Sequence, residues 1–356
     1  MKKANQGLSY IGKEVFIGID VHKKTYAVVA RMAGEVVKKW TTAASPQALA
    51  QQLLQYFTGA TIYTAYEAGF SGFVLHRELE QHGIHNLVVN AAGIEVAAND
   101  RVKTDKRDAH KLSILLEAKR LQGIRIPSEA EEAHRILTRT RQQLVEDRTS
   151  VQNKIRMKFH QLGRIDDDET RRMSHALVKE LLTKAPSKEL AIAINAYWKV
   201  WRSLDEEIKK IETELKAQAQ ADPNEKIYRS VPGVGPVSAR ILSNELGDMS
   251  QFQNERQLFS FTGLTPSEHS SGDIIRRGHI SRQGNSRVRG ILIEIAWRAI
   301  TKDKALAEFF ERLYPRTGKT KAIVAVARKL IGRIRAAFQK GENYQLDYGY
   351  TPAKAT

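Results

Sequence analysis

The stretch that decides the fold is Val15-Phe16-Ile17-Gly18-Ile19-Asp20, an apolar run that ends in a carboxylate. Two more short runs of β-forming residues follow, at 26–30 and 35–37, with turn residues before each of them. Short apolar runs separated by turn residues are typical of strands joined in hairpins. We therefore expect an antiparallel meander of three strands.

Helices and strands alternate after the meander. Ser45-Pro46 has the pattern of a helix start, with serine as cap and proline at the first helical position. Further elements are expected as a strand over 62–67, a helix over 70–82 closed by Gly83, a strand over 87–89, and a basic helix from about Lys106 to Leu121 ended by Gly123. Together they predict an α/β domain over residues 1–125, a mixed sheet flanked by helices.

The middle region, residues 126–222, carries almost no strand signal and is expected to be helical. Its second half has apolar residues spaced by three and four over three heptads, namely Ile194, Tyr197, Trp201, Leu204, Ile208, Ile211 and Leu215. This seam fits an oligomerisation stalk, which would make a dimer or tetramer. It fits equally well a hairpin within one chain, whose partner helix carries Leu137, Leu144, Val151, Ile155 and Leu162.

The third region, residues 223–340, is expected to be a mainly helical domain. The run 231–236, Val-Pro-Gly-Val-Gly-Pro, predicts a turn that leads into a helix, whose first N–H groups could face a phosphate. A segment rich in Ser, Gly and Arg covers 267–289, and helices follow to about Phe338. Residues 341–356 are expected to be a loose tail.

The composition points to a polyanionic partner. Lys and Arg number 57 against 40 Asp and Glu, which gives a net charge of +17, so nucleic acid is the first expectation. The absence of cysteine excludes disulfides, thiolate zinc sites and a cysteine nucleophile. Neither a signal peptide nor a membrane span is expected, which favours a cytoplasmic, nucleoid-associated protein.

The positive charge is concentrated in two segments, 101–125 and 271–290. Both lie within sequence that looks structured, as the contact surface for a phosphate backbone would. The side chains expected to bind nucleic acid there are Lys103, Lys106, Arg107, Arg276, Arg277, Arg282, Arg287 and Arg289.

Four carboxylates form the first candidate for chemistry. Asp20 and Glu67 each end an apolar strand, while Asp105 and Asp108 are three residues apart on one helix face. If the first and fourth strands are neighbours, the strand-end pair converges and the basic helix lays the other pair over it. Such oxygen ligands suit Mg²⁺ or Mn²⁺, and two such ions can assist phosphodiester chemistry. Each acid taken singly also fits a structural role, in a turn, an ion pair or a helix cap.

Hydroxyl groups form the second candidate. Ser267, Ser270 and Ser271 precede Gly272 and a run of arginines. A serine among guanidinium groups could attack phosphorus while the cations stabilise the developing charge. A flexible loop whose arginines only bind phosphate fits the same pattern.

Three N-terminal segments, at 16–23, 66–69 and 103–109, resemble the signatures of the DEDD transposases, the bridge-RNA-guided serine recombinases of bacterial insertion sequences. The segments 227–242, 261–266, 270–272 and 278–285 are similar to the C-terminal transposase domain of that family. The resemblance covers roughly residues 14–338, with the motifs in the expected order.

The resemblance implies an N-terminal domain of ribonuclease H type, like that of Holliday-junction resolvases, in which Asp20, Glu67, Asp105 and Asp108 coordinate Mg²⁺. It implies a serine nucleophile just before a glycine, which falls on Ser271, with Ser270 as the adjacent alternative. It further implies a phosphoserine link to DNA and a noncoding guide RNA that pairs with both donor and target DNA. That division of labour suits a basic protein without a recognisable sequence-reading module.

Two other functions stay open at the sequence level. One is a metal-dependent nuclease that hydrolyses DNA junctions with water and forms no covalent intermediate. The other is a scaffold that binds RNA or DNA and whose carboxylates are only structural.

Overall fold

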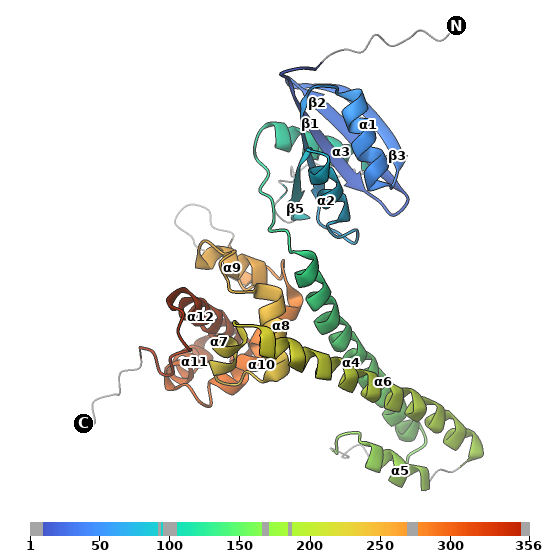
Figure 1. The fold of residues 1–356 in the computed structure, drawn as a ribbon. Helices are drawn as coiled ribbons and strands as arrows, with labels where there is room; N and C mark the ends of the chain where they lie inside the picture. The colour runs from blue at the N-terminus through green and yellow to red at the C-terminus, as the bar shows by residue number, and fades with distance from the viewer. Residues whose placement is uncertain are drawn as a thin grey trace. The chain divides into compact units, whose positions relative to one another are not determined.

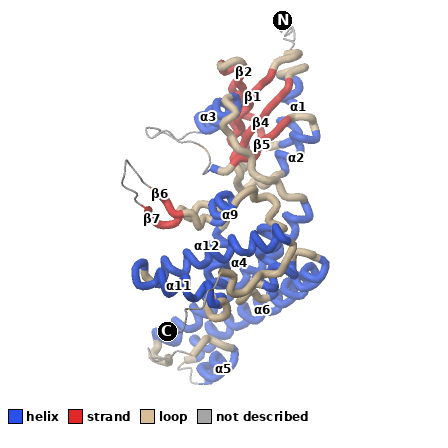
Figure 2. The backbone as a smooth tube through the Cα atoms, turned by 90° about the vertical axis from the view of Figure 1, so that its left-hand side faces the viewer, coloured by secondary structure: helices blue, strands red, loops and turns tan. Residues whose placement is uncertain are grey.

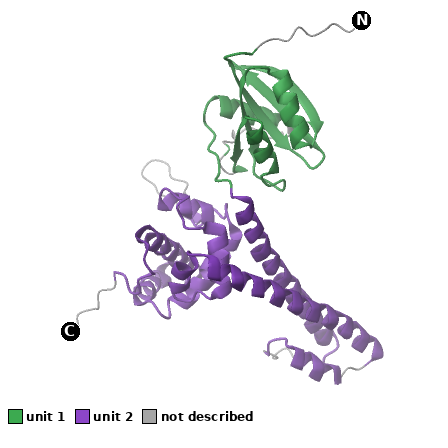
Figure 3. Cartoon of the chain, viewed as in Figure 1, with its two compact units in different colours: residues 1–126 green, residues 127–356 purple. Residues whose placement is uncertain are grey.

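The computed structural model describes residues 10–91, 94, 105–165, 171–183, 187–268 and 277–349, without the side chains of Asp105, Lys106, Glu268 and Arg277. The chain divides into two compact units, residues 1–126 and 127–356 (Figure 3). The first unit ends one residue after the expected boundary, and the second combines the expected middle and third regions.

A five-stranded mixed sheet forms the centre of the first unit (Figure 1). Its strands lie in the order β3-β2-β1-β4-β5, where β1 pairs antiparallel with β2 and parallel with β4. The strands are β1 (Glu14–Val21), β2 (Thr25–Met32), β3 (Glu35–Ala43), β4 (Thr61–Glu67) and β5 (His85–Val89). The predicted meander, the mixed sheet and the neighbouring first and fourth strands are confirmed.

Three helices accompany the sheet: α1 (Pro46–Tyr56), α2 (Val74–Gln81) and α3 (Asp105–Glu117). Ser45 caps α1 as predicted, since its side chain accepts a hydrogen bond from the N–H of Ala48. The expected start of the second helix at Phe70 is wrong, because Gly72 adopts a φ of 60° in the turn before it. The expected end of the third helix at Leu121 is also wrong, because Lys119 adopts a φ of 55°.

The alternation of side chains along β1 explains the layers of this unit. Ile17 and Ile19 are fully buried in one core together with Leu49 of α1 and Leu79 of α2. Gly18 points to the other face, where it meets α3. The sheet is therefore covered on both faces, which leaves its strand ends as the places where polar groups can gather.

The second unit begins with two long helices, α4 (Glu129–Gln161) and α6 (Lys188–Ala221), which pack along each other, and α5 (His175–Thr183) lies beside α6 (Figure 1). The predicted seam of α6 is buried at Ile194, Trp201, Ile208 and Leu215. The hairpin within one chain is thus confirmed, while oligomerisation stays a prediction. Leu162, expected on the partner seam, is 49 % exposed because α4 has ended before it.

The rest of the second unit is mainly helical. Its elements are α7 (Glu225–Ser230), α8 (Pro236–Leu246), α9 (Glu255–Thr262), β6 (Pro266–Glu268), β7 (Arg277–Ile280), α10 (Ser286–Ala299), α11 (Lys304–Thr317) and α12 (Lys319–Lys340). The predicted turn at 231–236 leads into α8, and Gly233 there has a φ of 83° and packs against α10. The short antiparallel pair β6–β7 was not among the expected elements (Figure 2).

The described part of the C-terminal segment, 341–349, differs from the expected loose tail. Tyr344 is only 7 % exposed, and its hydroxyl donates to Oδ2 of the buried Asp303 at 2.7 Å. Its backbone N–H donates to Oγ of Ser230 at 2.8 Å. One buried aromatic side chain with two partners is enough to dock this segment on the helices.

Candidate active site

The C-terminal ends of β1 and β4 bring two predicted site residues to one edge of the sheet. The last pair in the parallel register is Ile19 with Tyr66, so Asp20 and Glu67 come directly after it on neighbouring strands. The Asp20 side chain is 21 % exposed, and Glu67 is exposed. The predicted convergence of these two positions is therefore present.

Helix α3 reaches this edge because Gly18 lets its backbone approach β1. A Cβ atom on Gly18 would lie 1.9 Å from the carbonyl oxygen of Ala109 and 2.6 Å from the nitrogen of Ser113. No side chain fits in that space, so glycine allows the helix to rest directly on the strand. Asp108 is the neighbour of Ala109 and thus lies on the part of α3 that crosses β1.

The direction of α3 follows from its other end. Arg31, which pairs with Phe16 near the start of β1, donates from Nε to Oε2 of Glu117 at 2.8 Å. The end of α3 therefore lies at the start of β1, and its first turn lies toward Asp20. Asp105 begins that turn, but its side chain is outside the described part of the chain, as are Lys103 and the side chain of Lys106.

The contacts at the far end of α3 also set the pKa values there. Burial raises the pKa of Glu117, but hydrogen bonds from the N–H of Gly34 and from Arg31 outweigh it and hold that pKa below its ordinary value. Burial lowers the pKa of His110, and the nearby Lys39 and Arg31 add to the effect. This cluster anchors α3 at the end opposite to the carboxylates.

His22 is a neighbour of the site that the sequence reasoning did not single out. Its Nε2 lies 3.0 Å from Oδ2 of Asp20. The two residues are two positions apart at a strand end, and this spacing places both on the same face of a strand. That spacing was the signal available in the sequence.

The donors at this edge have the chemistry of a magnesium or manganese site, since both ions favour carboxylate oxygens. Among the side chains that the structure describes, no group of three or more His, Asp or Glu is close enough to hold a metal ion. The structure thus describes Asp20 and Glu67 at adjacent strand ends, and Asp108 on α3, the helix that crosses β1.

The second predicted group, on the segment rich in serine and arginine, is described only in part. Ser270, Ser271 and Arg276 lie outside the described residues, and so does the side chain of Arg277. Ser267 is described, and its Oγ donates to the carbonyl of His279 across the β6–β7 pair at 3.0 Å. We call residues 265–284 the arm, because β6 and β7 form its two sides.

The arginines at the end of the arm and just after it differ in their surroundings. Arg282 is exposed and has a φ of 57°. Arg289 donates from Nη1 to the carbonyl of Thr262 at 3.0 Å, and burial together with Arg282 lowers its pKa. Nε of Arg287 is buried, and no hydrogen-bond partner for it lies among the described residues. Arg289 thus has a structural contact besides any role with nucleic acid.

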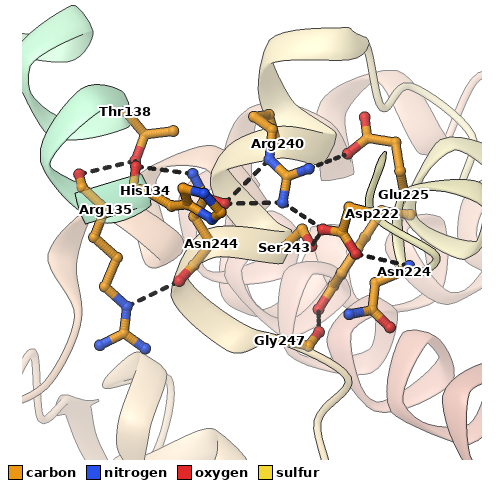
Figure 4. A network of polar contacts seen from close by, with 11 residues as sticks. His134, Arg135, Thr138, Asp222, Asn224, Glu225, Arg240, Ser243, Asn244 and Gly247 are labelled. Atoms are coloured by element: carbon orange, nitrogen blue, oxygen red, sulfur yellow. Dashed lines mark hydrogen bonds and ion pairs between the residues drawn. The ribbon is translucent and has the colours of Figure 1, made fainter. Parts of the chain in front are cut away.

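A polar network joins α8 to the end of α6 and to α4 (Figure 4). Arg240, 4 % exposed, donates from Nη2 to Asn244 at 2.8 Å and also to Asp222. Burial raises the pKa of Asp222, but hydrogen bonds from Ser243 and Arg240 outweigh it and lower that pKa. Asn244 in turn donates to the carbonyl of His134 at 3.0 Å, which ties α8 to α4.

Comparisons with known proteins give two family matches and several related transposases. Residues 17–163 match a family of DEDD type described as "Transposase", and residues 225–311 match the "Transposase IS116/IS110/IS902 family". The chain is 30 % identical to the transposase for insertion sequence element IS1111A of Coxiella burnetii, over 68 % of each protein. It is 27 % identical to the transposase for element IS1533 of Leptospira borgpetersenii, over 92 % of this chain and 96 % of that protein.

The class of protein is therefore an enzyme, a DNA transposase of an insertion sequence. The chain belongs to the IS116/IS110/IS902 family of transposases. The DEDD type implies the use of a divalent metal ion. None of the helices in the described ranges is long and apolar enough to cross a membrane.

Proposed function

We propose that this transposase cuts and rejoins DNA by serine attack on a phosphodiester with help from a divalent metal ion, guided by a noncoding RNA of its element. The observation that carries the proposal is the meeting of Asp20 and Glu67 at adjacent ends of parallel strands, with α3 directed so that its first turn lies toward the same edge. This arrangement supports a fold of ribonuclease H type.

The carboxylates of Asp20, Glu67, Asp105 and Asp108 would hold Mg²⁺ or Mn²⁺. A bound divalent ion supplies charge stabilisation at the phosphate and lowers the pKa of an attacking hydroxyl. His22, within 3.0 Å of Asp20, orients that carboxylate. The basic residues Lys103, Lys106 and Arg107, close in sequence to the start of α3, would hold the DNA backbone.

Ser271 is the proposed nucleophile. Its Oγ forms a bond to phosphorus as the bond from phosphorus to a deoxyribose oxygen breaks, and the released oxygen takes up a proton. The phosphoserine keeps the bond energy, so that attack by a DNA hydroxyl can rejoin the strands and release the serine. The carboxylates and Ser271 belong to different units, so the reaction requires the two units to meet, within one chain or between copies.

The guide RNA and the assembly are parts of the same proposal. The net charge of +17 supports binding of two polyanions, DNA and RNA. The arginines 276, 277, 282, 287 and 289 would contact their phosphates. The long α4–α6 pair offers an elongated surface on which copies of the chain could associate into a dimer or tetramer.

The deciding experiment is a cleavage assay on element-end DNA with the element's noncoding RNA and Mg²⁺, resolved on a denaturing gel that retains covalent protein–DNA species. We expect Ser271→Ala to abolish the covalent species while DNA binding persists, and Asp20→Asn to abolish cleavage altogether. Ser270→Ala is the matched control, and it should keep the covalent species.

Other outcomes of that assay point to other functions. Cleaved DNA without attached protein in the parent enzyme would replace the serine mechanism with water-dependent hydrolysis. Cleavage that persists in Asp20→Asn would remove the metal-binding role of the carboxylates. Cleavage that is equally fast without RNA would exclude the guide.

A further inference from the structure

A buried carboxylate joins three helices at the base of the arm. Glu245 of α8 is 1 % exposed. Arg139 of α4 donates to it twice, from Nε at 2.8 Å and from Nη2 at 3.0 Å. Asn285, just before α10, donates from Nδ2 to Oε2 of Glu245 at 2.8 Å.

Asn285 is the residue at which the arm returns to the helices. Its Oδ1 accepts hydrogen bonds from the N–H groups of Arg287 and Val288, so it is the N-cap of α10. Its own N–H donates to the carbonyl of Phe261 at 2.7 Å. One residue thus fixes the start of α10, the end of α9 and the carboxylate of α8.

The backbone beside Asn285 leaves the arm little freedom at its base. Gly263 and Gly284 have φ values of 66° and 115°. A Cβ on Gly263 would lie 2.5 Å from the carbonyl oxygen of Gln283, and one on Gly284 would lie 2.3 Å from that of Phe261. The two backbone segments of the arm therefore lie close together where they join the helices. We call this place, formed by Gly263 and Gly284, the neck.

The pair of Glu245 with Arg139, whose side chain is 41 % exposed, gives little net stability, because removing the charge of the carboxylate from water is costly. The pair instead fixes the orientation of the groups around it, since a carboxylate with three donors in fixed positions permits one arrangement of the groups that contact it. Here those groups come from α4, from α8 and from the base of the arm.

We propose that Arg139, Glu245 and Asn285 form a latch that sets the direction of the arm relative to α4 and α8. The three act as positioning residues. The consequence for catalysis rests on the proposed function, in which the arm contains the nucleophile Ser271. The direction of the arm itself can be tested without any assumption about Ser271.

The absence of native cysteine allows two labels to be placed at will. Nitroxide labels on Gln143→Cys of α4 and His279→Cys of β7, both exposed positions, report the distance between α4 and the arm. Asn285→Asp is the decisive variant, since aspartate keeps the cap of α10 but replaces the donor to Glu245 with a second negative charge. We expect a broader or shifted distance distribution in this variant, and an unchanged one would overturn the latch.

Exchanging the hydrogen-bond donor and acceptor between positions 245 and 285 distinguishes loss of the latch from general destabilisation of the fold. In the double variant Glu245→Gln with Asn285→Asp, the new amide can donate to the new carboxylate, so the narrow distribution should return in part. A double variant at least as disordered as Asn285→Asp alone would contradict the proposal. Glu212→Gln is the matched control, since it weakens a different ion pair of α4, that of Arg141 with α6.

The covalent-adduct assay adds the catalytic readout. The rate of adduct formation should fall about tenfold in Asn285→Asp, as for one lost charge-assisted hydrogen bond, and recover in the double variant. A disordered arm with an unchanged rate would contradict the positioning role. If Ser271→Ala still forms adducts, the assignment of Ser271 as the nucleophile fails, whereas the label distances alone then decide whether the latch exists.

Discussion

At the scale of single residues, Gly18 determines whether the predicted carboxylates can share one site. Its place in an apolar strand did not by itself reveal this role, because the contact with Ala109 is made by a helix about ninety positions later. The strand-end positions of Asp20 and Glu67 were predictable from the apolar runs before them. The approach of His22 to Asp20 was not deduced, since it depends on the rotamers at the strand end.

Gly18→Ala should therefore disturb both stability and activity. Its new Cβ would lie 1.9 Å from a backbone oxygen that cannot turn away, so α3 must shift. We expect a loss of about 1–3 kcal/mol in the free energy of unfolding, the usual effect of overpacking, with slower cleavage. Urea titration followed by circular dichroism measures the first effect. Gly69→Ala, whose Cβ would have no neighbour closer than 3.9 Å among the residues that the structure describes, should change stability much less.

At the scale of elements, the heptad spacing in α6 was sufficient to predict which side chains are buried, but it could not name the partner helix. In the structure the partner is α4 of the same chain, which packs along α6. The β6–β7 pair escaped prediction because its strands are only three and four residues long and contain Pro, Gly and Arg, with Ile280 as their one β-branched residue.

Trp201 is the test of this seam. It is 3 % exposed, and His175 of α5 stacks on its ring at 4.2 Å between centroids. Trp201→Ala should destabilise the second unit by about 3–5 kcal/mol, since it removes a large buried ring and a stacking partner. Thermal melting followed at 222 nm would show the change. Val200→Ala, at a position that is 50 % exposed, should lie within about 0.5 kcal/mol of the parent.

At the scale of the whole molecule, the division into an α/β unit and a helical unit could be predicted from the periodicity of apolar residues. Periodicity could not predict the hydrogen-bond network of the second unit, because Arg139, Glu245 and Asn285 are far apart in the sequence. Nothing in their local sequence distinguishes these residues from exposed ones.

The ion pair of Glu245 with Arg139 predicts that the stability of the fold depends on pH. Burial raises the pKa of Glu245, but the hydrogen bond and charge of Arg139 outweigh it, so the folded pKa lies below the ordinary 4.5. A depressed folded pKa means that the carboxylate stabilises the fold above pH 4.5 and loses this effect as the pH falls through the folded pKa. The melting temperature of Glu245→Gln should be below that of the parent at pH 7, and the gap should narrow below pH 4.5. A constant gap from pH 7 to pH 3 would contradict this origin.

The neck has a consequence for how such enzymes can diversify. The N–H of Asn285 meets the carbonyl of Phe261 at 2.7 Å, so the intervening segment starts and finishes at almost the same point of the helical scaffold. A longer or shorter insert leaves that point where it is, and each doubling of its length costs only about 0.6 kcal/mol in closure entropy. The segment can thus be exchanged between relatives without rebuilding the helices to which it is joined.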